Sequence, residues 1–502
     1  MTKILPRAAF VLSVGVLGFV YGFAAEAWNL FPRKNLTLSR MKSSLSFEKA
    51  WFAVSLLVLA FGYGFASHAW ELFPKTYVEQ AWRQGRQVFQ SSEKGPNVSM
   101  YDRVYDRAGV TNHNAEEVQP GLTLIISPWR DSIGWKQGLR LIDAQGRVLH
   151  EWETDKERIF QSNRVRGSVT WSSIHGAHVL PNGDALVNFL YLGMLRVDAC
   201  GDVLWTMREN NHHSIARAED GSFWVPGASE SRRSRSEGYP NGFPGLGEKK
   251  VWVDQLLRIS GEGKVLQKIG VLDVLYDNDL ERYLSKAWGP WGGTVLPNYG
   301  KYKADITHMN DIEPLSPSMA QEYPLFEAGD LLVSLRGPHL VFVLDPGSMK
   351  VKWHTSETLS YQHDPDYIGD GWIGILDNNP DFTERGKMSG GSRIVAIQPH
   401  TDSTRILFPT PRSDPFYTAG HGKWQQLENE NMLLTEARAG RAVEVTSDGK
   451  TVWEWIGKPF NESRVPLLTE ATRVDLTREE VASWSCSSVD SVSTAQNQQT
   501  AP

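Results

Sequence analysis

Short apolar runs recur along most of the chain after about residue 110, separated by turns rich in Gly, Asp and Asn. One unit runs from His175 through a Leu-Pro-Asn-Gly turn at 180–183, apolar runs at 185–190 and 194–198, and a closing run at 203–205. Runs this short, bounded by turn residues, predict β-strands. Repeated units of roughly 40–55 residues with about four strands each predict the blades of a β-propeller.

The closing runs recur at 148–152, 203–205, 265–268, 351–353 and 452–453, each after an Asp- or Gly-centred turn. We count six units between residues 109 and 460, some enlarged by insertions near 227–250 and 270–305. The prediction is an all-β, six-bladed propeller. Residues 75–108 are predicted to form a helical or irregular linker. Residues 461–502 are predicted to be a C-terminal extension, disordered from about residue 483 because its Ser, Gln and Thr residues offer little to bury.

Two apolar segments precede this region. Residues 8–25 and 50–67 carry no charge, and 18 residues is the lower limit for a membrane-spanning helix. Their ends repeat one pattern, Phe-x-Tyr-Gly-Phe-Ala followed by Ala-Trp-x-Leu-Phe-Pro. The pattern occurs at residues 19–32 and again at residues 61–74. Residues 1–74 are therefore predicted to be a membrane anchor of two related transmembrane helices, each ended by proline.

Charge predicts the orientation of this anchor. The loop at 33–49 holds five Lys and Arg residues against the single Glu48, which favours a cytoplasmic loop and an external propeller. The expected location is the cytoplasmic (inner) membrane, with the propeller on the periplasmic or extracytoplasmic side. Two alternatives remain open: the first segment is a cleaved signal peptide, or Met41 is the true start. Either one keeps the second anchor.

Composition excludes some classes of function. The chain has 41% hydrophobic and 22% charged residues and a net charge of -6, so it has no global basic field for nucleic acid. Its two cysteines, Cys200 and Cys486, exclude a framework of several disulfides and a Cys-rich metal site. They do not indicate the compartment.

Histidine marks the start of the repeated unit. Six of the 13 histidines precede a turn in the same way, five of them by eight residues; they are His113, His175, His213, His308, His363 and His421. The first strand of a propeller blade lines the central axis, so these side chains would converge at one mouth of the channel. A functional ring and a set of structural histidines both remain open. For His113 and His175 we favour the structural interpretation.

Several short motifs resemble the bacterial arylsulfotransferase family in order and spacing. The resemblance covers residues 109–456 and rests on Gly109-Val-Thr111 with Pro120–Leu124, His212-His213, His308-Met-Asn310, Ser334-Leu-Arg336, Ser360-Tyr-Gln-His363 and Asp377-Asn378. The chain departs from the family pattern in the acidic Asp364-Pro-Asp366, in Asn379 where a glycine is usual, in the anchor, and in the insertion at 288–303.

The resemblance implies an exported six-bladed propeller that moves a sulfuryl group from one phenol to another without a nucleotide donor. His363 would be the nucleophile that carries the group, and Arg336 and Asn310 would hold the sulfuryl oxygens. His213 and His308 would transfer protons. The implied substrate-binding residues are His212, His421 and Asn378. No metal or other cofactor is needed, and the expected partners are small phenolic substrates and the membrane.

A second hypothesis is a non-catalytic binding or scaffold module, because propellers host many unrelated functions. Convergence of His363, Arg336, Asn310 and His308 in one pocket would favour the enzyme. Each residue also has a structural alternative: Arg336 pairs with a carboxylate, Asn310 caps a turn, and His363 pairs with Asp364.

Overall fold

The computed structural model describes residues 47–69, 99–130, 134–160, 173–287, 304–381, 383 and 385–484. The chain divides into two compact units, Met1–Lys94 and Gly95–Pro502, which are described separately.

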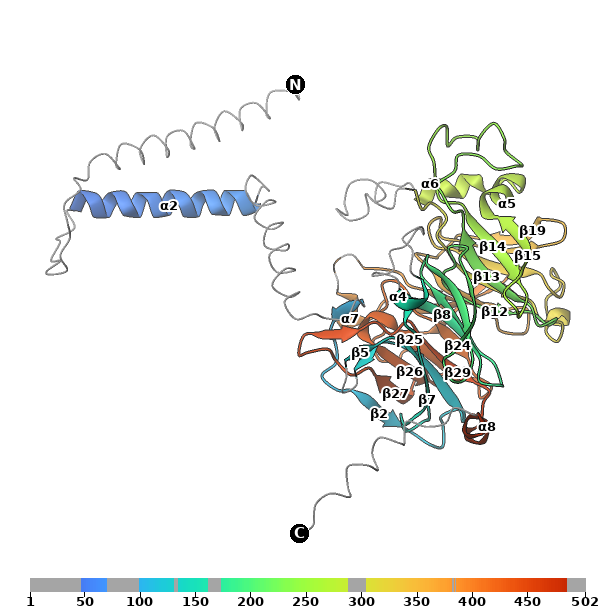
Figure 1. The fold of residues 1–502 in the computed structure, drawn as a ribbon. Coiled ribbons are helices and arrows are strands. Elements are labelled where there is room, and N and C mark those ends of the chain that lie inside the picture. Colours follow the sequence, from blue (N-terminus) through green and yellow to red (C-terminus); the bar gives the residue numbers. More distant parts are fainter. Residues whose placement is uncertain are drawn as a thin grey trace, which may run out of the picture. The chain divides into compact units, whose positions relative to one another are not determined.

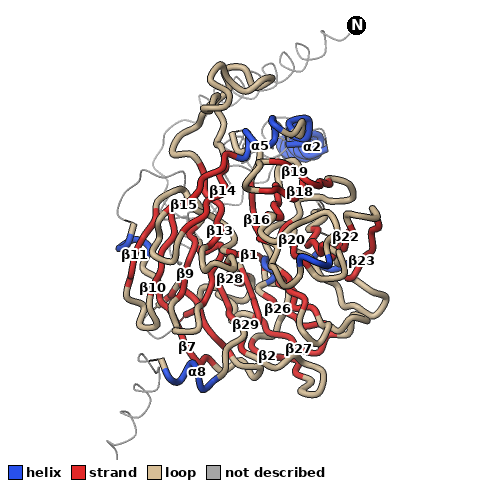
Figure 2. The backbone as a smooth tube through the Cα atoms, turned by 90° about the vertical axis from the view of Figure 1, so that its right-hand side faces the viewer, coloured by secondary structure: helices blue, strands red, loops and turns tan. Residues whose placement is uncertain are grey.

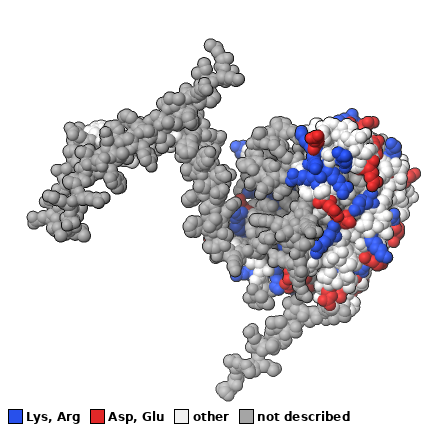
Figure 3. All heavy atoms as spheres, turned by 45° about the horizontal axis from the view of Figure 1, so that its top comes forward, with Lys and Arg blue, Asp and Glu red and all other residues white. Residues whose placement is uncertain are grey.

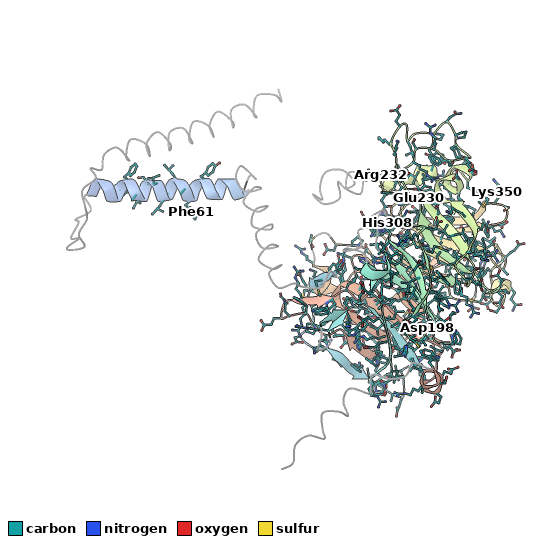
Figure 4. All side chains as sticks on the ribbon, in the orientation of Figure 1. Phe61, Asp198, Glu230, Arg232, His308 and Lys350 are labelled. Atoms are coloured by element: carbon teal, nitrogen blue, oxygen red, sulfur yellow. The ribbon has the colours of Figure 1, made fainter. Side chains whose placement is uncertain are left out.

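The first unit contains the helix α2 (Phe47–Ala69). Its large apolar side chains are exposed, among them Leu57, Leu59 and Phe61, the last of which is labelled in Figure 4. Within the described ranges, no helix is long and apolar enough to cross a membrane. The predicted pair of transmembrane helices is therefore not supported, and the first apolar segment, at 8–25, lies outside the described residues.

The second unit is an all-β propeller of six antiparallel blades (Figure 1). The first three blades, from inner to outer strand, are β29 (Glu470–Val474), β3 (Leu122–Ile126), β6 (Gly138–Ile142), β7 (Val148–Glu153); β8 (Ile174–Val179), β9 (Ala185–Phe189), β10 (Gly193–Val197), β11 (Val203–Met207); and β12 (Ala216–Arg217), β13 (Phe223–Ala228), β14 (Asp254–Ile259), β15 (Val265–Gly270).

The remaining blades follow the same order. They are β16 (Met309–Pro314), β17 (Leu331–Leu335), β18 (Leu340–Asp345), β19 (Lys350–Thr355); β20 (His363–Tyr367), β21 (Ile373–Asp377), β22 (Arg393–Gln398), β23 (Ser403–Phe408); and β24 (Trp424–Gln426), β25 (Met432–Glu436), β26 (Arg441–Val445), β27 (Thr451–Ile456), β2 (Gly109–His113). Two small pairs are added, β1 (Met100–Asp102) with β28 (Arg464–Pro466) and β4 (Trp129–Arg130) with β5 (Trp135–Lys136).

Short helices lie in the connections: α4 (Lys156–Ile159), α5 (Val271–Asp277), α6 (Leu284–Ala287), α7 (Gly386–Ser389), α8 (Arg478–Ser483) and the 3₁₀ turns η1 (Glu281–Tyr283), η3 (Ala320–Glu322) and η4 (Ala437–Ala439).

Burial explains why the second strands read as continuous apolar runs. Every residue of β9, β17, β21 and β25 is buried, because each of these strands is covered on both faces by neighbouring blades. The outer strands β11, β19 and β23 expose much of their length. In Figure 2, β16, β20 and β29 lie toward the middle of the disc, and β11 and β23 lie at its edge. On the face that Figure 3 presents, cationic and anionic side chains are interspersed.

Both ends of the propeller region close the ring. β29 pairs with β3 as the innermost strand of the first blade, whereas β2 pairs with β27 at the outer edge of the sixth. The strand pattern predicted that the propeller ends at residue 460. In the structure, residues after 460 complete it, because β29 is the inner strand of the first blade. Trp484, just after α8, packs its ring 5.0 Å from that of His150. The predicted disordered tail lies, from residue 485 onward, outside the described residues.

Cys200 occupies the turn between β10 and β11, and it is disulfide-bonded. The chain has one other cysteine, Cys486, which lies outside the described residues.

Candidate active site

The antiparallel blades bring the starts of their inner strands to one face. His175 lies in β8 and His363 begins β20, while His213, His308 and His421 precede β12, β16 and β24 by one to three residues. All five stand at the start of an inner strand, as their spacing predicts. His113 differs, since it lies on β2 at the outer edge of the sixth blade.

The imidazole rings of His175, His213, His308 and His421 form a continuous cluster, with His308 labelled in Figure 4. The ring centroid of His213 lies 5.1 Å from that of His175 and 5.4 Å from that of His308. His175 also lies 5.2 Å from His421. The structure therefore brings His175 into the site, although the sequence favoured a structural role for it.

An unusual backbone aims these side chains. His213, His308 and His421 have φ values of 55°, 47° and 63°, a region that non-glycine residues seldom adopt. The strand register shifts beside His175 and after His363, so that an extra residue interrupts the pairing at each point. Such bulges and positive φ values redirect side chains and are concentrated at functional sites.

His363 is held in one tautomer. Its Nδ1 lies 2.5 Å from Oδ1 of Asn378 and 3.0 Å from the carbonyl oxygen of Tyr361. The amide of Asn378 cannot turn around, because its Nδ2 donates to the carbonyl oxygens of Thr418 (2.7 Å) and His421 (2.9 Å). Nδ1 must therefore carry the proton, which leaves the lone pair on Nε2 available as a nucleophile. The contacts give Asn378 a positioning role rather than the predicted role in substrate binding.

Burial keeps these imidazoles neutral. Desolvation, aided by the charge of Arg336, lowers the pKa of His363 to about 3. Desolvation likewise lowers the pKa of His175 to about 4, and it holds the pKa values of His213 and His421 well below the ordinary value. A neutral imidazole is the form that can attack an electrophile.

Two arginines at this face have no carboxylate partner in the part of the chain that the structure describes. Among the described residues, neither Arg336 nor Arg438 forms a side-chain hydrogen bond or ion pair, and the Nε of each is buried. Arg336 lies over the ring of Tyr361, 5.8 Å from its centroid, and its backbone N–H donates to the carbonyl oxygen of His308 at 3.1 Å. Among the described residues, no carboxylate pairs with Arg336, as the structural alternative for this residue would require. An uncompensated guanidinium beside neutral imidazoles is suited to an anionic ligand.

His308 has a carboxylate behind it. Its Nδ1 lies 2.7 Å from Oδ2 of Asp305, whose side chain is 5% exposed. The hydroxyl of Tyr191 donates to the same oxygen at 3.4 Å. This pairing directs Nε2 of His308 away from Asp305 and stabilises the ring when it gains a proton.

Two other predicted residues support the site from behind. Asn310 donates to the carbonyl oxygen of Gln362 at 2.8 Å, next to the nucleophile, and its Oδ1 is buried without a partner in the described part of the chain. His212 is fully buried, with its Nδ1 2.7 Å from that of His213 and its Nε2 3.8 Å from Asp254. His212 therefore contacts His213, and not the open face.

A cluster of buried charges lies on the same inner strands. Asp364 accepts from Lys423 Nζ at 2.5 Å and from the backbone N–H of Trp424 at 2.8 Å. It therefore pairs with Lys423 and not with His363, which accounts for one acidic departure from the family pattern. Burial raises the pKa of Asp311 and of Glu313 nearby. In the described ranges, no three His, Cys, Asp or Glu side chains are arranged to hold a metal ion.

Sequence reasoning missed Arg438, Asp305 and Tyr191. One signal could have found two of them. The residues just after a second strand recur at this face, where Tyr191 follows β9, Arg336 follows β17, Asn378 follows β21 and Arg438 follows β25. The end of the second strand lies beside the start of the first, so this position is a landmark like that of the histidines.

Comparison with known families decides the relationship. The model of the arylsulfotransferase (ASST) family matches residues 176–458, which is more than half of the chain. This chain belongs to the arylsulfotransferase family. The match spans the second to sixth blades and includes all the predicted site residues, so the arylsulfotransferase resemblance read from the motifs is confirmed.

Comparison with curated proteins gives no match. Among solved structures, a protein of unknown function from Bacteroides caccae is 13% identical, with 70% of this chain and 99% of that chain covered, at a TM-score of 0.42. A streptogramin B lyase is 11% identical, with 72% and 87% covered, at 0.35. At these TM-scores the likeness carries no argument about what this arylsulfotransferase family member does.

Proposed function

We propose that this chain is an aryl-sulfate sulfotransferase that moves a sulfuryl group from a phenolic sulfate ester to a phenol acceptor through a covalent intermediate on His363. The observation that carries the proposal is the locked tautomer of His363, whose Nε2 lone pair is available beside the unpaired Arg336. Family membership supports the same chemistry. A scaffold would not need a partly buried guanidinium without a carboxylate partner in the described chain next to a neutral, oriented imidazole.

In the first half-reaction, Nε2 of His363 attacks sulfur, and the bond between sulfur and the aryl oxygen breaks. The oxygen leaves with the electron pair as a phenoxide and takes a proton from His308. Arg336 stabilises the negative charge on the sulfuryl oxygens. The proton stays on Nδ1 of His363, in the hydrogen bond to Asn378. The intermediate is therefore an imidazolium N-sulfonate whose positive and negative charges cancel.

In the second half-reaction, a phenol gives its proton to Nε2 of His308, and its oxygen attacks sulfur. The bond between sulfur and Nε2 of His363 breaks, which restores the neutral imidazole. His308 regains the proton that it lost, so atoms, charges and protons balance over the cycle. Asp305 stabilises the protonated state of His308 between turnovers.

The test is intact mass spectrometry of the full chain after a pulse of an aryl sulfate without acceptor. We expect a mass increase of one sulfuryl group in the wild type and none in His363→Asn. Steady-state transfer should fall by at least ~10³-fold in this variant, because no other group replaces the nucleophile. His113→Asn, on the outer edge of the sixth blade, is the matched control. Full activity in His363→Asn would disprove the assignment.

We also propose that the propeller acts outside the cytoplasm and is held at the cytoplasmic membrane by its N-terminal apolar residues. The exposed apolar side chains of α2 and the basic loop at 33–49 support attachment and orientation. The disulfide at Cys200 supports an oxidising compartment, where such bonds persist. Protease added to intact spheroplasts should degrade the propeller. Protection of the residues after 100 would refute this location.

A further inference from the structure

The residues just before His363 connect the fifth blade to the fourth. The side chain of Gln362 is fully buried, and its Nε2 donates to Oγ of Ser334 at 3.2 Å and to the carbonyl oxygen of Leu335 at 3.1 Å. Both acceptors belong to β17, the strand that ends immediately before Arg336. The segment that carries the proposed nucleophile is therefore attached to the strand that leads to the proposed sulfuryl-binding arginine.

Tyr361 lies at this junction and contacts both groups. Its φ of 58° is a left-handed value that non-glycine residues seldom adopt. Its carbonyl oxygen lies 3.0 Å from Nδ1 of His363, the ring nitrogen that carries the proton. The face of its ring lies against the guanidinium of Arg336, whose Cζ is 5.8 Å from the ring centroid. One residue thus joins the nucleophile to the arginine.

A second aromatic side chain supports the ring of Tyr361. The ring centroid of His339 lies 4.9 Å from that of Tyr361. His339 belongs to the same turn as Arg336, because its backbone N–H donates to the carbonyl oxygen of Arg336 at 3.2 Å. The turn packs closely at Gly337, where a Cβ would stand 2.6 Å from the carbonyl oxygen of Ile306. The turn that carries the arginine therefore also contacts the tyrosine ring.

The guanidinium of Arg336 has no carboxylate to orient it. Within the described residues, it forms no side-chain hydrogen bond or ion pair. A long side chain without such a partner loses rotamer freedom when it binds a ligand, and this loss opposes binding. An aromatic face within about 6 Å attracts a guanidinium without neutralising its charge. The ring of Tyr361 can therefore orient this side chain and leave its N–H groups available for an anion.

The charge of Arg336 reaches the histidine cluster. Burial is the main cause of the low pKa values of His175, His363 and His421, and the positive charge of Arg336 lowers all three further. The guanidinium thus lies on the side of Tyr361 where the sulfuryl group would be bound.

We propose that Tyr361 is a positioning residue, whose ring orients Arg336 toward the sulfuryl group while its carbonyl oxygen accepts from Nδ1 of His363. This inference rests on the proposed function for the identity of the anion. The binding step can be tested without any transfer, because a sulfonate presents the same three oxygens on a carbon–sulfur bond that is not cleaved. The carbonyl oxygen is present in every variant, so substitutions of Tyr361 test the ring alone.

The test measures binding of methanesulfonate and of benzenesulfonate to the full chain by calorimetry. Methanesulfonate has no ring, so its affinity reports the arginine and not a contact between aromatic rings. We expect Tyr361→Leu to weaken the binding of both sulfonates equally, by about 2- to 30-fold, and Tyr361→Phe to stay within about twofold of the wild type. In the Arg336→Met background, Tyr361→Leu should have no further effect, because the ring acts through the arginine.

Tyr283→Leu is the matched control. Tyr283 also lies against an arginine, with Cζ of Arg282 5.3 Å from its ring centroid. Its hydroxyl lies 3.1 Å from Nε2 of His354 on the outer strand β19, away from the histidine cluster. We expect this variant to bind both sulfonates like the wild type.

A series of fluorinated rings keeps the test valid even if Tyr361→Leu does not fold. Phenylalanine at this position and its 4-fluoro and 3,4,5-trifluoro derivatives have similar shapes, but each fluorine withdraws electron density from the face of the ring. We expect methanesulfonate affinity to fall progressively along this series.

Three results would overturn the proposal. They are unchanged methanesulfonate binding in Tyr361→Leu or along the fluorinated series, a loss confined to benzenesulfonate, and an additive loss in the Arg336→Met background. The second would mean that Tyr361 contacts the aryl group directly. Sulfonate binding that depends on both residues, in a chain that transfers no sulfuryl group, would retain the positioning role and reject the proposed function. Sulfuryl transfer with sulfonate binding that does not depend on Tyr361 would do the reverse.

Discussion

The pair of Asp305 and His308 makes a demanding prediction about the chemistry. Replacing Asp305 with Asn keeps the size of the side chain and an oxygen that can accept from Nδ1 of His308, but it removes the negative charge. That charge lies 2.7 Å from the imidazole on a side chain that is 5% exposed, so solvent screens it little. A hydrogen bond to a charged group contributes roughly 1.5–3 kcal/mol. This corresponds to about 10- to 150-fold in any step in which His308 carries the proton.

The assay compares two sulfate donors in the full chain. Phenyl sulfate releases a basic phenoxide that needs a proton from His308, whereas 4-nitrophenyl sulfate releases a stable phenoxide that needs it much less. We expect kcat/KM of Asp305→Asn to fall by about 10- to 150-fold with phenyl sulfate, and by clearly less with 4-nitrophenyl sulfate. Asp220→Asn is the control, because Asp220 is half exposed and pairs with Arg258 away from the site.

Two results would refute this reasoning. An equal loss with both donors would mean that Asp305 only maintains the fold or the position of the loop. No loss with phenyl sulfate would mean that His308 does not protonate the leaving group, and His213, whose ring lies 5.4 Å away, would then be tested in its place.

Three further predictions address the oxyanion contact, the buried carboxylates and the disulfide. Arg336→Lys should lower transfer by about 10- to 100-fold in steady-state assays, because the charge remains but the planar fork is lost; an effect below twofold would contradict a role at the sulfuryl group. Burial raises the pKa of Glu313 above its unfolded value, so its stabilising contribution is present at low pH and is lost as pH rises. The melting temperature should therefore fall from pH 5 to pH 9, and less so in Glu313→Gln; equal slopes would exclude Glu313 as the cause. Thiol titration of the denatured, unreduced chain should find no free thiol, and Cys200→Ser should cost roughly 2–4 kcal/mol of stability; a titratable thiol in the wild type would contradict the disulfide.

Much of the propeller could be predicted because its strands are local features. The closing runs at 148–152, 203–205 and 265–268 correspond to β7, β11 and β15, since a short apolar run bounded by turn residues is a local signal for a strand. The closure of the ring could not be predicted in this way. β29 pairs with β3, which lies more than 300 residues earlier in the chain. No local sequence pattern indicates which strand the last strand of the chain will pair with.

For the site, the sequence by itself determined which blades carry a histidine at the start of the first strand, because the eight-residue spacing to the turn is a local property. Only the tertiary structure decided what each histidine can do. The tautomer of His363 depends on Asn378, and the orientation of Asn378 depends on carbonyl groups of the loop that leads into the next blade. The absence of a carboxylate beside Arg336 and Arg438 within the described chain is likewise a property of packing. Protonation and charge balance depend on neighbours in space and on burial, and these are settled only when the six blades close around one axis.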